Sequence, residues 1–191
     1  ENVYHIHSIL RDYLQTHFYC HQPEDFQNRA LRIAGRCYAA DSQLFTAARL
    51  YYKIKDFDAI LSLPFDSVYI INQREENMFD FIKVVFDACP EETLCKYPFV
   101  LLMFSYVMFL WGDPETFRKG CQLIDFSIKE NYASLGQYEL QKLKGEFLLV
   151  TSIVEHKDIK SIWEGEVKAC KLLKGASSII SNEALWFEAL F

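Results

Sequence analysis

The chain of 191 residues is poor in the residues that form tight turns, with only 7 glycines and 5 prolines. An all-β protein needs many such turns, so this composition argues against that class. Long hydrophobic runs are also missing. The most apolar stretch, "FVLLMFSYVMFLW" at residues 99–111, is shorter than the roughly 20 residues that span a bilayer. We therefore expect no membrane-spanning segment and interpret this stretch as a buried helix.

Basic residues are outnumbered, with 20 Lys and Arg against 26 Asp and Glu and a net charge of -6. Proteins that bind nucleic acid present a basic face to the phosphates, so we expect this chain not to bind DNA or RNA itself. The phosphate-loop pattern G-x-x-x-x-G-K-[ST] is missing as well, which predicts that the chain alone does not bind or hydrolyse ATP. A hydrophobic content of 51% can bury a large core, and disorder is not expected.

The six cysteines form no C-x-x-C pair and are scattered over the sequence as Cys20, Cys37, Cys89, Cys95, Cys121 and Cys170. The first residues contain neither the charged region nor the apolar region of a secretion signal. These two observations favour free thiols in a reducing, cytoplasmic setting. Because the chain begins inside sequence of helical character, we also expect it to be a piece of a longer protein.

Helical periodicity extends over most of the chain. Ser8 can cap a first helix with apolar residues at positions 9, 10, 13, 14 and 18, and Gln22-Pro23 ends it. A second helix carries Phe26, Ala30, Ile33 and Cys37 at spacings of four, three and four. Asp41-Ser42 is predicted to form a turn and a cap, and a third helix follows to about Lys55. Similar stripes recur over 78–89, 117–128, 140–154 and 159–173. For "SVYII" at 67–71 we favour helix or loop over strand, because no partner strand is evident.

Three junctions between these helices resemble one another. In each, an apolar or aromatic helix is followed by a tight turn that contains Asp56, Asp113 or Asp158, and an amphipathic helix comes next. Their spacing is irregular and does not fit the period of about 34 residues of a strict tetratricopeptide array. The sequence therefore predicts an all-α fold of stacked antiparallel helix hairpins, a superhelix of the general tetratricopeptide-like type.

Four of the five histidines and one cysteine gather in "YHIHSILRDYLQTHFYCH" at residues 4–21. His17 and His21 share a helix face, Cys20 is adjacent, and His5 and His7 precede the helix. A zinc site needs three or four such ligands converging, and no H-E-x-x-H pattern is present. We favour the simpler interpretation that these histidines lie at a helix end, where the helix dipole favours a cation, and we predict no metal ligands.

No sequence signature joins a cysteine or a serine to a histidine base. The paired carboxylates Glu75-Glu76 and Glu91-Glu92 fall in polar turns or in first helical turns, where they complement helix dipoles. We therefore predict neither catalytic nor cofactor-binding residues and expect that the chain is not an enzyme. The aromatic residues that precede turns are Tyr51, Tyr52, Phe104, Tyr106 and Trp111. Most of them are expected in the core, so the residues that contact a ligand stay unknown.

Three stretches follow one another in an order that resembles a known family. They are "YHIHSILRDYLQTHF", "FQNRALRIAGRCYAADSQLFTAARLYYKIKDFDAILSL" and "ACPEETLCKYPFVLLMFSYVMFLWGD". Together they resemble the helical-repeat region of MalT-like, LuxR-type ATP-binding transcriptional regulators. The chain departs from the family pattern at Cys37-Tyr38, where a Trp-aromatic pair is frequent, and at Leu44 and Lys55, where small residues or glycines are frequent.

The resemblance implies that residues 1–22 are the tail of a winged-helix segment and that residues 23–191 belong to a helical-repeat domain that continues past Phe191. In that family an ATP-binding module precedes this domain, and a helix-turn-helix that binds DNA follows it. The domain itself is the sensor: a small-molecule inducer or a protein effector shifts the population of states, and with it oligomerisation and DNA binding.

Two other functions stay open at this point. A free-standing helical-repeat adaptor would bind a peptide or protein partner without a DNA-binding module. A metal-dependent or thiol enzyme is the weakest alternative, and stoichiometric zinc in the purified chain would support it. The gene sequence upstream and downstream discriminates the regulator from the adaptor, because the regulator requires both flanking modules.

Overall fold

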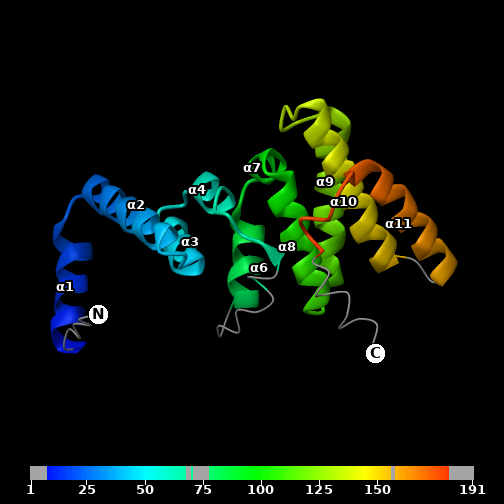
Figure 1. Ribbon diagram of the computed structural model, residues 1–191. Helices are drawn as coiled ribbons and strands as arrows, with labels where there is room; N and C mark the ends of the chain where they lie inside the picture. Colours follow the sequence, from blue (N-terminus) through cyan, green and yellow to red (C-terminus); the bar gives the residue numbers. More distant parts are fainter. Residues whose placement is uncertain (1–7, 68–69, 71–77, 156–157, 181–191) are drawn as a thin grey trace. The chain divides into compact units, whose positions relative to one another are not determined.

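A computed structural model describes residues 8–67, 70, 78–155 and 158–180 (Figure 1). Within these ranges the chain is built from α-helices and contains no β-strand, which confirms the predicted all-α class. The chain divides into two compact units, Glu1–Leu63 and Pro64–Phe191, which are described separately below. The predicted winged-helix origin of residues 1–22 stays a prediction.

The first unit holds helices α1 (Ser8–His21), α2 (Glu24–Ala40), α3 (Leu44–Lys53) and α4 (Phe57–Leu61). The ends of these helices agree with the breaks expected at Gln22-Pro23 and at Asp41-Ser42. Helices α2 and α3 form an antiparallel hairpin, and the short helix α4 packs against α3. The core of this unit consists of residues of α3 and α4 such as Phe45, Tyr51 and Ile60.

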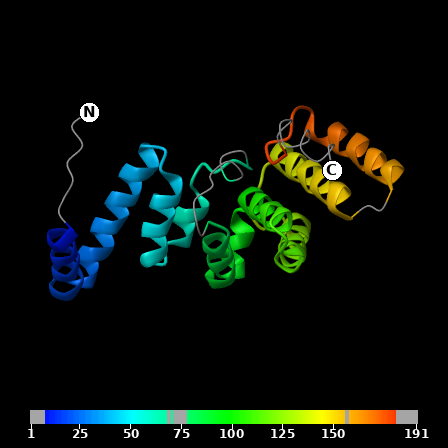
Figure 2. The same cartoon turned by 90° about the horizontal axis from the view of Figure 1, so that it is seen from below.

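The second unit holds α6 (Met78–Ala88), α7 (Glu91–Lys96), α8 (Pro98–Leu110), α9 (Pro114–Glu130), α10 (Gln137–Glu155) and α11 (Ile159–Leu173). The hairpin α8–α9 lies beside the hairpin α10–α11, as both views of the ribbon show (Figures 1 and 2). Helix α8 is the predicted apolar helix. It is buried from Leu101 to Met108 because α6, α7, α9 and α10 all contact it.

The three aspartates expected at the junctions each cap the N-terminus of the helix that follows. Asp56 accepts the amide of Ala59 at 3.2 Å, Asp113 that of Thr116 at 3.0 Å, and Asp158 that of Ser161 at 2.9 Å. Each carboxylate satisfies a backbone donor that the helix leaves without a partner. Asp56 and Asp113 also bind a cation from an earlier helix: the Arg32 guanidinium lies 2.8 Å from Asp56, and Lys83 Nζ lies 2.5 Å from Asp113.

A glycine lies at the contact between the two helices in each of the described hairpins α2–α3, α8–α9 and α10–α11. A Cβ atom added to Gly35 of α2 would lie 2.5 Å from the Tyr51 ring of α3. The same addition at Gly120 of α9 would meet Ser105 of α8, and at Gly165 of α11 it would meet Ser152 of α10. Each glycine therefore lets two helices approach more closely than any larger residue would allow.

Lys55 adopts a left-handed backbone with φ 54° between α3 and α4. Side chains other than glycine adopt this conformation at a cost. We expect Lys55→Gly to raise the free energy of unfolding by about 0.5–1 kcal/mol, measured by urea denaturation. Lys168→Gly, in the middle of α11, is the matched control and should lower it by about 1 kcal/mol. Equal losses in both variants would contradict this prediction.

Candidate interaction surfaces

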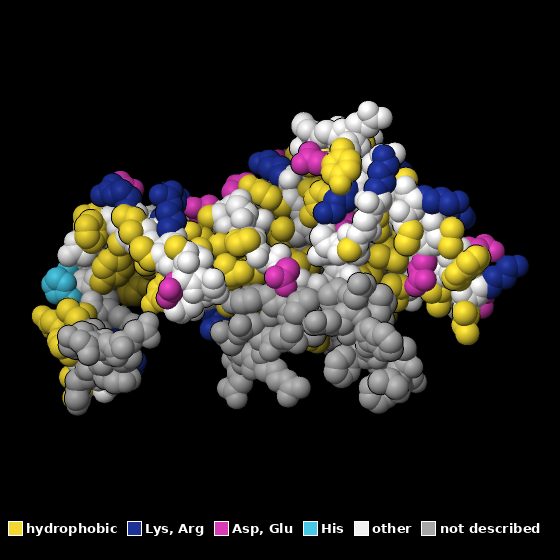
Figure 3. Space-filling view, in the orientation of Figure 1, with side chains coloured by type: hydrophobic (Ala, Val, Ile, Leu, Met, Phe, Trp, Pro, Cys, Tyr) yellow, Lys and Arg dark blue, Asp and Glu magenta, His cyan; other side chains and the backbone are white. Residues whose placement is uncertain are grey.

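Helix α1 has an apolar face that the rest of its unit leaves uncovered. None of its residues is buried, and Ile9, Leu10, Tyr13 and Leu14 are exposed to between 49% and 73%. These side chains share one face, because residues three and four apart are neighbours on a helix. The sequence predicted this apolar face correctly. In the space-filling view, hydrophobic side chains gather over this part of the chain (Figure 3).

The C-terminal end of α1 is fixed to its own unit by a few specific contacts. The Phe18 ring lies 6.3 Å from that of Phe26 in α2. Lys53 Nζ lies 3.2 Å from the Tyr19 hydroxyl and 5.6 Å from the centre of the Tyr19 ring. The Gln27 side chain donates hydrogen bonds to the carbonyls of Tyr19 and Gln22. The last turn of α1 is therefore held in place against α2 and α3.

The apolar stripe of α2 is exposed as well. Phe26 and Cys37 are exposed, and Ile33 is exposed to 61%. The face that α2 turns toward α3 centres instead on the buried Gly35. The two helices approach closely at this glycine, and the larger side chains of α2 remain outside the contact.

Helix α11 shows the same arrangement in the second unit. The stripe that the sequence defines includes Ile159 and Trp163, which are exposed to 85% and 63%. The residues that α11 buries against the rest of the unit are Gly165, Ala169 and Leu173, so Leu173 alone belongs to both sets. Hydrophobic side chains are visible near the first turns of this helix (Figure 3).

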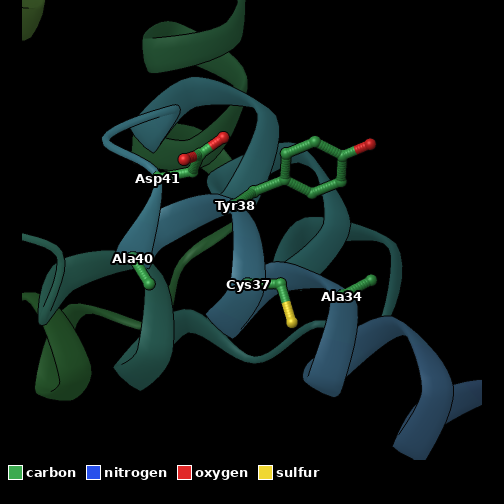
Figure 4. Close-up of a pocket in the computed structure, with 5 residues that line it drawn as sticks. All are labelled: Ala34, Cys37, Tyr38, Ala40 and Asp41. Atoms are coloured by element: carbon green, nitrogen blue, oxygen red, sulfur yellow. The ribbon is translucent and has the colours of Figure 1, made fainter. Parts of the chain in front are cut away.

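An open hollow of about 540 Å³ lies on α2 and its C-terminal end. Five residues line it: Ala34, Cys37, Tyr38, Ala40 and Asp41 (Figure 4). The Asp41 carboxylate lies 3.3 Å from the side-chain amide of Gln43, which donates to it. Because all five residues come from one helix and its cap, the hollow extends the exposed face of α2 and lacks an opposing wall.

A buried carboxylate holds the segment that follows α11. Glu146 of α10 is completely buried and accepts hydrogen bonds from the Ser177 hydroxyl, from the Ser178 hydroxyl at 2.8 Å and from the Ser178 amide at 2.7 Å. Ser177 Oγ in turn accepts the amides of Ile179 and Ile180 at 3.1 and 2.9 Å. The segment 177–180 is therefore bound to α10 by a network whose polar groups satisfy one another.

The histidines at the start of the chain form no metal cluster in the described part of the structure. His17 and His21 lie on α1 with ring centres 4.8 Å apart, and Cys20 beside them is exposed. No group of three or more metal-ligating side chains occurs among the residues that the structure describes. His5 and His7 lie outside the described residues, as do Glu75 and Glu76.

The aromatic residues that precede turns are largely in the core, as expected. Tyr51, Phe104 and Tyr106 are buried, whereas Tyr52 and Trp111 are half-buried. Trp111 packs edge-to-face on Phe79 at 5.8 Å. Burial raises the pKa of the Tyr51 hydroxyl, which keeps this residue neutral. Glu91 and Glu92 occupy the first turn of α7, where carboxylates complement the helix dipole.

The pKa shifts occur at structural positions. The hydrogen bond from Lys83 lowers the pKa of Asp113 to about 2, and the bond from the Thr116 amide acts in the same direction. The Asp113 carboxylate raises the pKa of Lys83 through the same contact. Burial raises the pKa of the Cys95 thiol, which is therefore held in its neutral form. These groups stabilise helix ends and the core.

The helices and their contacts define an all-α chain of antiparallel helix hairpins. Comparison with known proteins gives no match: no family model, no curated protein and no solved structure is significantly similar to it. None of the described helices is long and apolar enough to cross a membrane. What the chain binds must therefore be argued from its own surfaces.

Proposed function

We propose that this chain is a helical-repeat interaction domain, of the tetratricopeptide-like type, that binds a protein partner through the apolar face of α1. The observation that carries the proposal is that α1 buries none of its residues while four large side chains form one exposed face. Apolar patches of this kind on a folded chain are typical of interaction sites.

The charges on α1 favour a protein as the occupant of this face. Arg11 and Asp12 are its only Lys, Arg, Asp or Glu residues, and their charged groups lie 3.6 Å apart. Such a surface offers little attraction to phosphates or to anionic lipids, which require clusters of basic residues. An apolar stripe of nearly two turns suits instead an amphipathic helix of a partner, with large side chains at helical spacing.

The narrower form of the proposal is the sensor domain of a LuxR-type, MalT-like transcriptional regulator in the cytoplasm. Its support is the order of three motifs in the sequence. In that form ATP and DNA would bind to modules outside residues 1–191, and an inducer or a protein effector would shift the oligomeric state. The alternative is a free-standing adaptor. The gene sequence decides between them: a phosphate loop upstream and a helix-turn-helix downstream must both be present for the regulator.

A photo-crosslinking amino acid placed at Leu14, on the apolar face of α1, tests the general proposal in the cells that make the protein. We expect one defined protein adduct from Leu14 and no such adduct from Gln15, which is exposed and lies on the side of the helix opposite the centre of the apolar face. Leu10→Glu in the Leu14-labelled chain should abolish the adduct, because a charge on the contact face must be desolvated. The same adducts from both positions, or none from either, would exclude α1 as the interaction site.

A further inference from the structure

The second unit contains a small cavity of about 210 Å³ that is distinct from the exposed helix faces. Helices α10 and α11 form two of its sides, and the segment 175–180 forms the third. Four aliphatic side chains line it, namely Leu149, Ile153, Leu173 and Ile180. The other lining residues are Glu166, Cys170, Gly175, Ala176 and Ser177. We call this cavity the α10–α11 cup.

The network around Glu146 fixes the shape of the cup. Ser177, which lines the cup, donates its hydroxyl proton to Glu146 and accepts two backbone amides with the same oxygen. Ile180, which also lines the cup, is buried, and its own backbone amide donates to Ser177 Oγ. The third side of the cup is therefore part of the folded structure, as preformed ligand sites require.

One polar side chain in the cup has no partner among the described residues. The hydrogen-bonding capacity of Ser177 is used, and Cys170 offers only a weakly polar thiol. Glu166 is half-buried, and its carboxylate makes neither a hydrogen bond nor an ion pair with any residue that the structure describes. A carboxylate beside an aliphatic wall accepts hydrogen bonds only, and it forms its strongest ones with cationic donors.

The size of the cup limits the ligand. A volume of 210 Å³ equals the space of about seven water molecules in the liquid. Cavities for drug-sized ligands are larger, from about 300 Å³ upward. The cup therefore fits a compact ligand of about seven non-hydrogen atoms, with an apolar body against the aliphatic side chains and one charged end at Glu166.

We propose that the α10–α11 cup is a binding site for a small primary amine, whose ammonium group pairs with the Glu166 carboxylate and whose hydrocarbon body contacts Leu149, Ile153 and Ile180. This site goes beyond the proposed partner surface on α1, and neither depends on the other. A protein that binds a partner through α1 would thereby also respond to a small cationic metabolite.

Cys170 provides a direct measurement of occupancy, because it lines the cup and is exposed. The whole chain is treated with iodoacetamide at pH 7.5, and the rate at each cysteine is read from its peptide by mass spectrometry. The probe is n-hexylamine, which is protonated at this pH. We expect it to slow alkylation of Cys170 with half-protection at roughly 1 mM, while the rate at the exposed Cys37 stays unchanged.

Two probes of similar size and one pair of variants test whether the Glu166 carboxylate selects a cationic ligand. Hexan-1-ol and hexanoate should protect Cys170 at least about tenfold more weakly than hexylamine, because Glu166 attracts a cation and repels an anion. Glu166→Gln should weaken protection by hexylamine about tenfold, whereas Glu164→Gln, on the same helix but outside the cup, should leave it unchanged. The melting temperature of each variant reports whether it is folded.

Three results would overturn the proposal. The first is full reactivity of Cys170 at 10-fold the expected half-protection concentration. The second is equal protection by all three probes, which would make the cup an apolar cavity without charge selection. The third is an equal loss of protection in Glu166→Gln and Glu164→Gln. None of these results bears on crosslinking from Leu14, so the proposal for α1 is tested separately.

Discussion

Gly120→Val is expected to lower the free energy of unfolding of the second unit by about 3 kcal/mol. A Cβ at this position would lie 2.8 Å from Ser105 Cβ and 3.3 Å from the Phe86 ring. Ser105 cannot move away freely, because it lies in the buried helix α8 and donates its hydroxyl to the Leu101 carbonyl at 2.6 Å. The hairpin α8–α9 must therefore separate, and its core contacts weaken.

Urea denaturation followed by circular dichroism measures this loss. Gly136→Val is the matched control, because a Cβ at Gly136 would meet only the Glu139 carboxylate at 3.6 Å. We expect that variant to lose less than about 0.5 kcal/mol, as surface substitutions usually do. A loss at Gly120 no larger than at Gly136 would show that the two helices are not in close contact there.

Asp113→Ala is expected to destabilise the second unit by about 2 kcal/mol, because it removes both an N-cap and an ion pair. The Asp113 side chain is 10% exposed and the Lys83 side chain is 44% exposed, so solvent screens part of their attraction and the cap supplies much of the effect. Asp113→Asn retains a capping oxygen and loses the charge, so we expect a loss intermediate between the wild type and Asp113→Ala. Asp125→Asn, which breaks an exposed pair with Lys129, is the control and should cost less than about 0.5 kcal/mol.

The pH dependence of the stability of these variants separates the contribution of the Asp113 charge from that of its N-cap hydrogen bond. The pKa of Asp113 is about 2 in the folded chain and about 3.9 when unfolded. The stabilisation by its charge is therefore complete above about pH 5 and is lost as the pH falls through 2. The difference in stability between the wild type and Asp113→Asn should shrink over that range. A difference that is constant from pH 6 to pH 2 would assign the whole effect to the cap.

Local sequence signals predicted the helix boundaries well. The sequence predicted Asp56, Asp113 and Asp158 in the turns between helices. The structure adds that each caps the next helix by accepting an amide three residues further on. The break at Gln22-Pro23 and the burial of α8 were predicted from equally local patterns, a proline and a continuous apolar run. Such features depend on neighbours along the chain and not on tertiary contacts.

The burial of the apolar stripes could not be predicted in the same way. Periodicity identifies which face of a helix is apolar, but not whether another element covers that face. Ile33 and Trp163 lie on strongly periodic stripes and are nevertheless exposed, because α2 and α11 pack through Gly35 and Gly165. A glycine contributes nothing to a hydrophobic pattern, so the true contact faces were invisible in the sequence.

The α10–α11 cup was missed for a related reason. From the sequence alone, Glu166 is an ordinary surface residue of an amphipathic helix. In the structure, Ile180 and Glu166 line the same cavity, and this makes the carboxylate part of a site. Nothing in the sequence around Ser177 and Ser178 indicates that they bind the Glu146 carboxylate, which lies more than thirty residues earlier in the chain. Sites built from non-local contacts need coordinates before they can be recognised.

The glycine contacts within the hairpins have an evolutionary consequence. Each involves two positions of one hairpin, Gly120 with Ser105 and Gly165 with Ser152, so a larger residue at one position is tolerated only with a smaller residue at the other. Substitutions at these pairs should therefore be inherited together, and in diverged homologues the pairs should covary while the surrounding apolar positions exchange freely. A search for such paired positions, rather than for overall similarity, offers a route to distant relatives of this chain.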